Sequence, residues 1–236
     1  MNIAMILAAG SGSRMGNTNK PKQFLNIYNK PLIVHTIEAF EMHDKIEMII
    51  IVTNDTYVDQ VKIWCKQFDL AKVKHIVVGG ASRQESVYNG IKYLEKFTKD
   101  DDIVVLHDAN RPLISDAVLD ESIKVATEHG NALSVLPCND AMFVSYDEYI
   151  AEEHVDKKIL FQGQTPETFK FSVINDACER NIKGDGVDLS ISALLLNSKA
   201  KVYLSKGSPL NFKITTAGDI DIFKALLATP LTEKIK

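Results

Sequence analysis

Four continuous apolar runs alternate with segments of helical pattern, and this alternation constrains the fold more than any other feature. The runs cover residues 3–7, 48–52, 74–78 and 103–107. Because their apolar residues are continuous, both faces of each predicted strand are expected to be buried, as in a parallel sheet with helices on both sides. The sequence therefore predicts a doubly wound α/β fold with a mostly parallel sheet.

The remaining elements are predicted from periodicity and from turn residues, with Pro31 suited to a first helical turn. Helices are expected over residues 31–42, 55–68, 82–97, 115–129, 171–182, 189–198 and 217–227, and further strands over 132–136 and 201–204. No linker-like or low-complexity segment divides the 236 residues, so we expect a single domain over residues 1–236.

Residues 138–163 lack helical periodicity and predict an extended excursion with a turn near residues 146–152. A long hairpin of this kind is marginally stable by itself. We therefore expect it to pack against a second subunit, which makes the protein a homodimer through residues 138–163.

Charge and hydropathy exclude several classes of function. A formal net charge of −4 argues against a nucleic-acid-binding surface, although a local basic cluster can still bind a small anion. No apolar stretch approaches the roughly 18 residues of a membrane span, and three scattered cysteines indicate neither a disulfide framework nor a zinc site. The sequence predicts a cytoplasmic protein with a small-molecule substrate and no membrane or nucleic-acid partner.

The first predicted strand ends in the glycine-rich stretch AAGSGSRMG, residues 8–16, and Arg14, Lys20 and Lys22 lie in or near it. Lys22 is expected to be an exposed loop lysine. Backbone N–H groups of such a loop can approach phosphate oxygens, and the cations can neutralise their charge. Met15 stands where a dinucleotide-binding loop has its third glycine, and no Gly-Lys-Ser/Thr follows as in a P-loop. A plain strand-to-helix turn explains the glycines but not the cations, so we interpret the stretch as a triphosphate site.

Three further segments carry chemistry, and two of them directly follow predicted strands. Ligands of doubly wound sheets bind beyond the carboxyl ends of the strands. Gly79 and Gly80 permit close backbone approach and precede Ser86, Asp108 is a lone carboxylate at a strand end, and Lys213 interrupts an apolar segment. Asp108 could bind Mg²⁺ or could cap a helix, and the glycine pair could be an ordinary turn.

These motifs together resemble the alditol-phosphate cytidylyltransferases, a family that includes the methylerythritol phosphate enzymes of isoprenoid synthesis and the ribitol-5-phosphate enzymes of teichoic acid and capsule synthesis. The resemblance runs in order along nearly the whole chain. It rests on the segments 8–16, Pro21-Lys22-Gln23-Phe24-Leu25, Gly79-Gly80, His107-Asp108-Ala109-x-Arg111-Pro112, Gln164-Thr165-Pro166 and Asn211-x-Lys213-Ile214-Thr215-Thr216.

The resemblance implies a nucleotidyltransferase that joins CTP and an alditol phosphate into a CDP-alditol and pyrophosphate, with Mg²⁺ or another divalent cation, in a homodimer with exchanged arms. It implies Arg14, Lys22 and Lys213 as catalytic residues and Asp108 as the metal ligand. Lys157 stands where the family usually has an arginine that reaches the other subunit's substrate. By the same resemblance CTP is bound by Ala8, Ala9, Gly10, Ser11, Gly12, Gly80, Ser86, Asp108 and Ala109, and the alditol phosphate by Asp108, Lys157, Thr165, Asp188 and Lys213.

The acceptor is left open between two branches of this family, with another alditol or sugar phosphate as a third alternative. Residues 161–166 and the five residues between Met15 and Pro21 resemble the ribitol branch, which favours ribitol 5-phosphate over methylerythritol phosphate. Residues 185–192 depart from the Thr-Asp-Asp/Glu-Ala-Ser motif of the family, and Asn110 stands where small residues are common. A nucleotide-binding regulator that has lost turnover is the alternative from another class.

Overall fold

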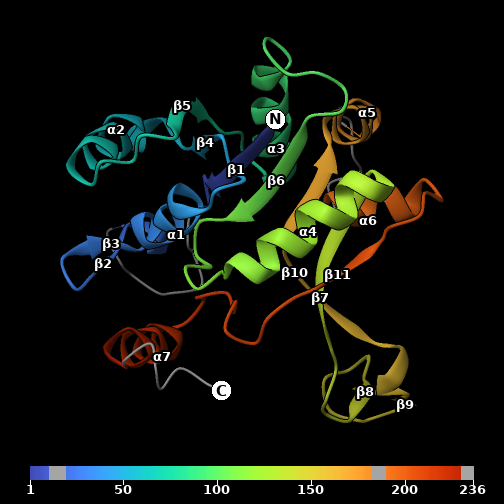
Figure 1. The fold of residues 1–236 in the computed structure, drawn as a ribbon. Coiled ribbons are helices and arrows are strands. Elements are labelled where there is room, and N and C mark those ends of the chain that lie inside the picture. Colours follow the sequence, from blue (N-terminus) through green and yellow to red (C-terminus); the bar gives the residue numbers. More distant parts are fainter. Residues whose placement is uncertain (11–19, 182–189, 230–236) are drawn as a thin grey trace.

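A seven-stranded sheet forms the centre of the protein (Figure 1). The computed structural model describes residues 1–10, 20–181 and 190–229 of the chain. Across the sheet the strands follow the order β11 (Leu204–Lys206), β7 (Asn131–Pro137), β10 (Phe161–Lys170), β6 (Ile103–Asp108), β1 (Asn2–Ala8), β4 (Met48–Thr53) and β5 (Val73–Val78). Every neighbouring pair is parallel except the two pairs that involve β10, which runs antiparallel to β6 and β7. The carboxyl ends of β1, β4, β5 and β6 therefore meet at one edge of the sheet.

Helices cover both faces of this sheet. One face packs against α1 (Leu32–Met42), α2 (Val58–Gln67) and α4 (Asp116–His129), and the other against α3 (Arg83–Leu94), α5 (Phe171–Asn181) and α6 (Ile191–Asn197). Within β1, Ala4 and Ile6 face the first layer, whereas Ile3 and Met5 face the second. Because successive side chains of a strand point to opposite faces, a strand covered on both faces is apolar at every position.

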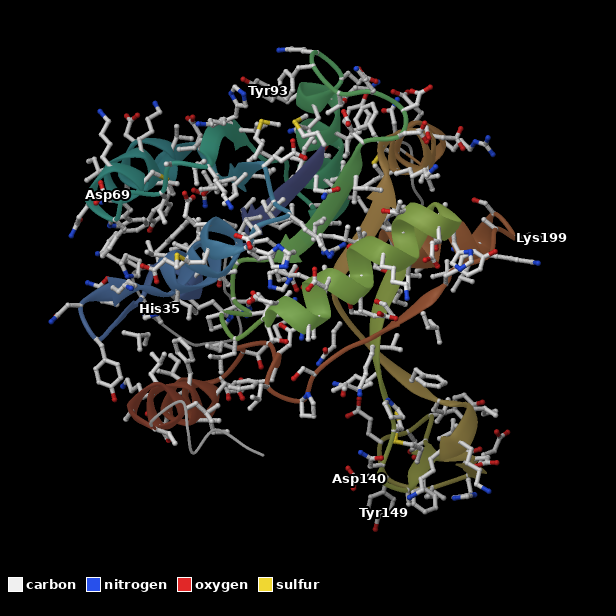
Figure 2. The ribbon with its side chains drawn as sticks, in the orientation of Figure 1. His35, Asp69, Tyr93, Asp140, Tyr149 and Lys199 are labelled. Atoms are coloured by element: carbon white, nitrogen blue, oxygen red, sulfur yellow. The ribbon has the colours of Figure 1, made fainter. Side chains whose placement is uncertain are left out.

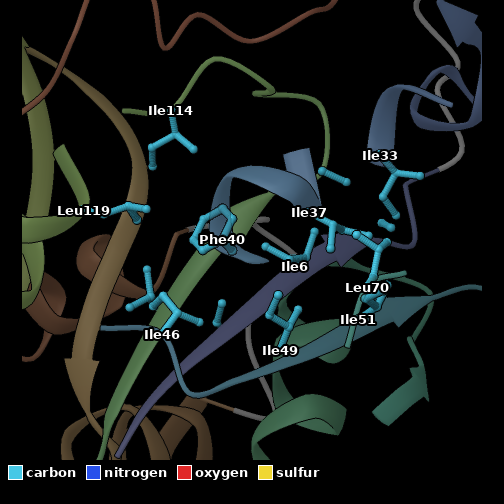
Figure 3. Close-up of a cluster of buried hydrophobic side chains, with 14 of the residues drawn as sticks. Ile6, Ile33, Ile37, Phe40, Ile46, Ile49, Ile51, Leu70, Ile114 and Leu119 are labelled. Atoms are coloured by element: carbon cyan, nitrogen blue, oxygen red, sulfur yellow. The ribbon is translucent and has the colours of Figure 1, made fainter. Parts of the chain in front are cut away.

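The first layer contains a dense aliphatic core (Figure 3). Phe40 of α1 and Ile6 of β1 are completely buried in it, together with Ile49 and Ile51 of β4. Replacing a buried phenylalanine such as Phe40 by alanine typically costs about 3–5 kcal/mol, so this core makes a large contribution to stability.

A smaller apolar cluster holds the last helix, α7 (Ala217–Ala228), against the hairpin of β2 (Asn26–Ile27) and β3 (Lys30–Pro31). Phe223 of α7 and Ile214 are fully buried beside Ile27 and Leu32. The helix begins with a capping box in which Thr216 and Asp219 bond each other's backbone N–H groups. The cluster thereby fixes the segment that carries Lys213.

An arm projects from the body between β7 and β10 (Figure 1). It contains β8 (Met142–Val144), which pairs antiparallel with β9 (Glu153–Val155), and a 3₁₀ turn, η4 (Lys157–Ile159). Asp140 and Tyr149 lie on this part of the chain, away from the sheet (Figure 2). The exposed side chains of Phe143, Tyr149 and Ile159 give the arm an apolar surface.

The predicted doubly wound, mostly parallel sheet is confirmed, but one strand was not foreseen. Residues 161–163 belong to β10, where they pair with residues 135–137 of β7, so the excursion ends at residue 160 and not at 163. The last strand of the sheet spans residues 204–206 and not 201–204. Of the helices in the described ranges, none is both long and apolar enough to cross a bilayer.

Candidate active site

Asp108, at the carboxyl end of β6, lies among three cations. Lys213 Nζ is 2.9 Å from Asp108 Oδ2, Arg111 Nε is 3.7 Å from the same oxygen, and Arg83 Nη2 is 3.9 Å from Oδ1. The aspartate side chain is 11% exposed and that of Lys213 is 36% exposed, so the cluster is half-open to solvent. Three positive charges around one carboxylate form a site that attracts polyanions.

The cations determine the protonation state of Asp108. Burial alone would raise the pKa of its carboxyl, but Lys213, Arg83 and Arg111 outweigh this effect and hold the pKa well below its usual range. Burial lowers the pKa of the Arg111 guanidinium, and its contact with Asp108 opposes that effect. Asp108 is therefore ionised at neutral pH and can act as an acceptor or a cation ligand.

A buried hydrogen-bond chain orients the strand end that carries Asp108. The N–H of Asp108 donates to Thr165 Oγ1 at 3.2 Å, and this hydroxyl lies 3.2 Å from His107 Nδ1. His107 Nε2 lies 3.0 Å from the carbonyl oxygen of Arg111, which can only accept, so Nε2 carries the proton. Thr165 then donates to His107 Nδ1. The chain gives His107 a structural role and connects Thr165 to the site.

Two contacts fasten the segment that carries Lys213. Arg111 donates through Nη1 to the carbonyl oxygen of Asn211 at 2.7 Å, and Asn211 donates through Nδ2 to the carbonyl oxygen of Thr165 at 2.7 Å. Asn211 is completely buried. The segment before α7 is thus joined to both β10 and the loop after β6.

A second buried carboxylate, Glu167 of β10, lies behind Arg83. Its Oε1 accepts a hydrogen bond from Arg83 Nη2 at 3.0 Å, and its Oε2 accepts from the N–H of Ser192 at the start of α6 at 2.8 Å. Glu167 is 2% exposed, so these hydrogen bonds take the place of contacts with water. Sequence reasoning missed Arg83 and Glu167 as site residues, although Arg83 comes three residues after Gly80 and Glu167 directly follows the Thr-Pro dipeptide.

The glycine pair at the end of β5 is a tight turn held by Ser86. The Ser86 hydroxyl accepts from the N–H of Gly80 at 3.1 Å and donates to the carbonyl oxygen of Ser82 at 2.8 Å. A Cβ atom on Gly80 would lie 2.2 Å from the Cβ of Glu85, so a larger residue does not fit there. The structure places Gly80 and Ser86 together, and a role in nucleoside recognition stays a prediction.

Gln23 fixes the end of β1, where the glycine-rich loop begins. Its Nε2 donates to the carbonyl oxygens of Ala8 and Gly10, at 2.7 and 2.8 Å. Lys22 begins a short 3₁₀ turn, η2 (Lys22–Phe24), and is 9% exposed. We expected an exposed loop lysine there, and this expectation is wrong, because the turn folds back under the end of β1.

Other predicted site residues either bond elsewhere in the structure or lie outside the described residues. Ala109 is buried, and its N–H and C=O bond Leu7 and Thr36, so its main chain serves the fold. Lys157 lies on the arm, where its Nζ donates to the carbonyl oxygen of Asn139 at 2.5 Å. Ser11, Gly12, Arg14 and Asp188 lie outside the described residues.

The Asp108 carboxylate is the group of this cluster that could hold a magnesium ion together with phosphate oxygens. Mg²⁺ in nucleotide sites is usually bound by one or two carboxylates, with phosphates and water completing the shell. Within residues 1–10, 20–181 and 190–229, no group of three or more His, Cys, Asp or Glu side chains could form an all-protein metal site. An ionised aspartate at the half-open edge of the sheet fits the first arrangement.

Comparisons with known proteins point to one family. The family model described as IspD, 2-C-methyl-D-erythritol 4-phosphate cytidylyltransferase, matches residues 2–229. A ribitol-5-phosphate cytidylyltransferase of Lacticaseibacillus paracasei is 34% identical over 231 residues, which are 96% of this chain and 98% of the relative. A 2-C-methyl-D-erythritol 4-phosphate cytidylyltransferase of Clostridium botulinum is 34% identical over 227 residues, 96% of this chain and 97% of the relative.

Solved structures agree with the fold. The crystal structure of 4-diphosphocytidyl-2C-methyl-D-erythritol synthase from Anaerococcus prevotii superposes with a TM-score of 0.82 at 23% identity and covers 97% of this chain and 98% of that protein. The seven-stranded sheet and its flanking helices are therefore an arrangement shared with that enzyme.

Proposed function

Since the chain belongs to the IspD family of cytidylyltransferases, we propose that it transfers CMP from CTP to an alditol phosphate and that D-ribitol 5-phosphate is the acceptor. The products are CDP-ribitol and pyrophosphate. The proposed acceptor is supported by relatives named ribitol-5-phosphate cytidylyltransferase from Lacticaseibacillus paracasei and Vibrio parahaemolyticus, each 34% identical over nearly the whole chain. The Gln-Gly-Gln-Thr-Pro stretch of β10 supports the same choice.

The observation that carries the reaction type is the Asp108 cluster at the carboxyl edge of the sheet. Lys213 and Arg111 lie within 2.9 and 3.7 Å of the Asp108 carboxylate at the end of β6, which pairs with β1. The glycine pair after β5 also lies beside the end of β1, since a Cβ atom on Gly79 would be 2.7 Å from the Cβ of Ala9. A triphosphate placed along this edge meets backbone N–H groups and positive charge together.

The chemistry requires positioning and charge neutralisation more than acid–base catalysis. An oxygen of the acceptor's phosphate attacks the α-phosphorus of CTP, the bond from that phosphorus to the β-phosphate bridging oxygen breaks, and pyrophosphate leaves. The nucleophile is already anionic, so no proton has to be removed. Lys213, Lys22 and Arg14 are proposed to stabilise the negative charge that develops at the α-phosphate.

We further propose that Asp108 binds Mg²⁺ together with the phosphates of CTP. The bound cation would neutralise phosphate charge. Lys213 could then turn from Asp108 to the phosphates, since its side chain is 36% exposed, whereas the Arg111 side chain is 11% exposed and donates to the carbonyl oxygen of Asn211. Asp108 thereby orients Lys213 before the substrates arrive.

The arm is proposed to join two subunits into a homodimer. Phe143, Tyr149 and Ile159 are 60, 91 and 73% exposed, and a projecting two-stranded hairpin has too little core to retain its shape alone. A second copy of the chain would cover these side chains, and Lys157 would then lie at the partner's alditol phosphate.

A second acceptor, 2-C-methyl-D-erythritol 4-phosphate, is favoured by the Clostridium botulinum relative at the same 34% identity. The test is to supply CTP and Mg²⁺ with each alditol phosphate in turn and to measure pyrophosphate release and kcat/KM. The proposal requires ribitol 5-phosphate to give the highest kcat/KM, whereas a preference for methylerythritol phosphate assigns the chain to the second acceptor. CTP binding without turnover on any acceptor would indicate a nucleotide-binding regulator.

A further inference from the structure

Asn110 connects the loop that follows Asp108 to the segment that carries Lys213. Its side chain donates through Nδ2 to the carbonyl oxygen of Ile214 at 2.8 Å, and its own carbonyl oxygen accepts from the N–H of Ile214 at 2.9 Å. Both polar groups of Ile214 are therefore bound by one residue. Asn110 is 7% exposed and Ile214 is completely buried, so water cannot replace these bonds without a local opening.

The two bonds fix the backbone immediately after Lys213. On the other side of Lys213, Arg111 bonds the carbonyl oxygen of Asn211 at 2.7 Å. Asn110 and Arg111 thus hold the backbone on both sides of Lys213, and we call these bonds the bracket. Within it, Lys213 Nζ lies 2.9 Å from the Asp108 carboxylate. The distance between Lys213 and Asp108 is set by this bracket, because both residues belong to the segments that it joins.

We infer that Asn110 is a positioning residue that holds Lys213 at the reacting phosphates, an inference that rests on the proposed role of Lys213. The Nδ2 group of Asn110 donates to Ile214 and so acts on the segment that carries Lys213. An alanine at this position would keep the bond to the Ile214 N–H, which uses backbone, but would leave the buried carbonyl oxygen of Ile214 without its donor. The lysine would then gain freedom relative to Asp108.

The effect is expected in kcat more than in substrate binding. A misplacement of a charged group by about 1 Å can cost on the order of 10²-fold in rate, because the group acts on charge that develops only in the transition state. Because the bond from Arg111 to Asn211 remains in the variant, we expect Asn110→Ala to lower kcat about tenfold and to change the KM for CTP little.

Asn131 offers a matched control. It is 6% exposed, donates through Nδ2 to the carbonyl oxygen of Lys201 at 3.0 Å and accepts from the N–H of Tyr203 at 3.0 Å. Like Asn110, it joins two segments by a pair of hydrogen bonds, but it lies at the amino end of β7, and the carboxyl ends form the site. Asn131→Ala should lower Tm by several degrees and leave kcat unchanged below the transition.

The test is a double-mutant cycle between Asn110 and Lys213. The kcat of pyrophosphate release is measured for the wild type, Asn110→Ala, Lys213→Ala and the double variant, with Tm measured for each. If Asn110 acts through Lys213, Asn110→Ala lowers kcat about tenfold in the wild type and less than about twofold in the Lys213→Ala background, while Tm falls similarly in both. Should Asn110→Ala not fold, Asn110→Ser takes its place, since its hydroxyl is too short to reach Ile214 directly but keeps a polar group there.

Three other outcomes overturn the inference and differ from each other. An equal loss of kcat in both backgrounds means that Asn110 affects turnover independently of Lys213, and no loss in either means that Asn110 serves the fold alone. Both outcomes leave the proposed role of Lys213 intact. A Lys213→Ala variant with wild-type kcat removes Lys213 from the mechanism, and the role of Asn110 fails together with that part of the proposed function.

Discussion

Lys213 Nζ lies 2.9 Å from Asp108 Oδ2, which joins the segment before α7 to the carboxyl end of β6. Burial by itself would favour the neutral form of Asp108, and the surrounding cations reverse this preference. The contact has two consequences for function. Asp108 is ionised and ready for a cation, and Lys213 is positioned at the edge of the sheet before any phosphate arrives.

Asp108→Asn tests the first consequence. The amide keeps the shape of the side chain but loses the charge that holds Lys213 and the proposed metal. We expect kcat to fall about 10²-fold or more and the Mg²⁺ concentration for half-maximal activity to rise. Asp101→Asn is the control, because its side chain is 87% exposed and pairs only at the surface with Lys170. Unchanged activity of the wild type in excess EDTA would contradict the metal role.

Lys22→Met and Lys22→Ala together separate the charge of Lys22 from its packing. The side chain is buried in η2, so alanine removes both an apolar stem and a cation, whereas methionine keeps most of the stem. If the charge acts on the transition state, both variants lose about 10²-fold in kcat. A methionine variant with near-wild-type turnover, measured by pyrophosphate release, would show that Lys22 has only a packing role.

The central strands were predictable because burial on both faces leaves continuous apolar runs. The run at residues 48–52 predicted β4 to within one residue of its end at Thr53. Strand β10 gave no such signal, since it combines Gln164, Thr165, Pro166 and Glu167, which are all buried. Its polar residues are buried because they form the hydrogen bonds of the site. A pattern of apolar residues cannot predict a strand that is buried for this reason.

Site residues were predictable where a single charged residue stands out in an otherwise apolar segment. Asp108 and Lys213 stand out in their segments and are in contact in the structure. Arg83 and Glu167 were not predicted, because their relation depends on a helix start and a strand that are 84 residues apart in the sequence. The supporting role of Asn110 likewise depends on its contact with Ile214, which the sequence does not show.

His107 predicts how the stability of the metal-free protein changes with pH. Burial lowers its pKa from 6.5 to about 4 in the folded state. Between these values the unfolded chain binds a proton that the folded protein does not, so the free energy of unfolding falls as the pH falls, by about 3 kcal/mol in total. Chemical denaturation at pH 4.5, 5.5 and 7 measures this slope. His107→Gln should flatten it, and an equal slope in the variant would exclude His107 as the cause.

The Arg83–Glu167 pair predicts non-additive effects on stability. Arg83→Gln removes the cation that bonds the buried Glu167 carboxylate and leaves the hydrogen bond from the N–H of Ser192. This loss should lower the free energy of unfolding by about 3–5 kcal/mol. Adding Glu167→Gln removes the buried charge, so the double variant should be more stable than Arg83→Gln alone. Urea unfolding of the four proteins gives the coupling energy. Additive effects would mean that the two side chains do not depend on each other.

The arm provides the last test, because a shared site makes activity depend on two chains. Lys157 is held at the base of the arm by its bond to Asn139, so its position moves with the arm. If the arm reaches a partner subunit, Lys157→Ala raises the KM for the alditol phosphate and leaves that for CTP nearly unchanged, since only the acceptor loses a charge partner. Lys158→Ala, a change at the neighbouring exposed lysine, is the control.

Mixing Lys157→Ala with the inactive Lys22→Ala variant creates heterodimers in which one of the two sites has both lysines, and activity should partly return as subunits exchange. An active protein that sediments as a monomer, or verified heterodimers that recover no activity, would show that Lys157 is only a solvated surface charge.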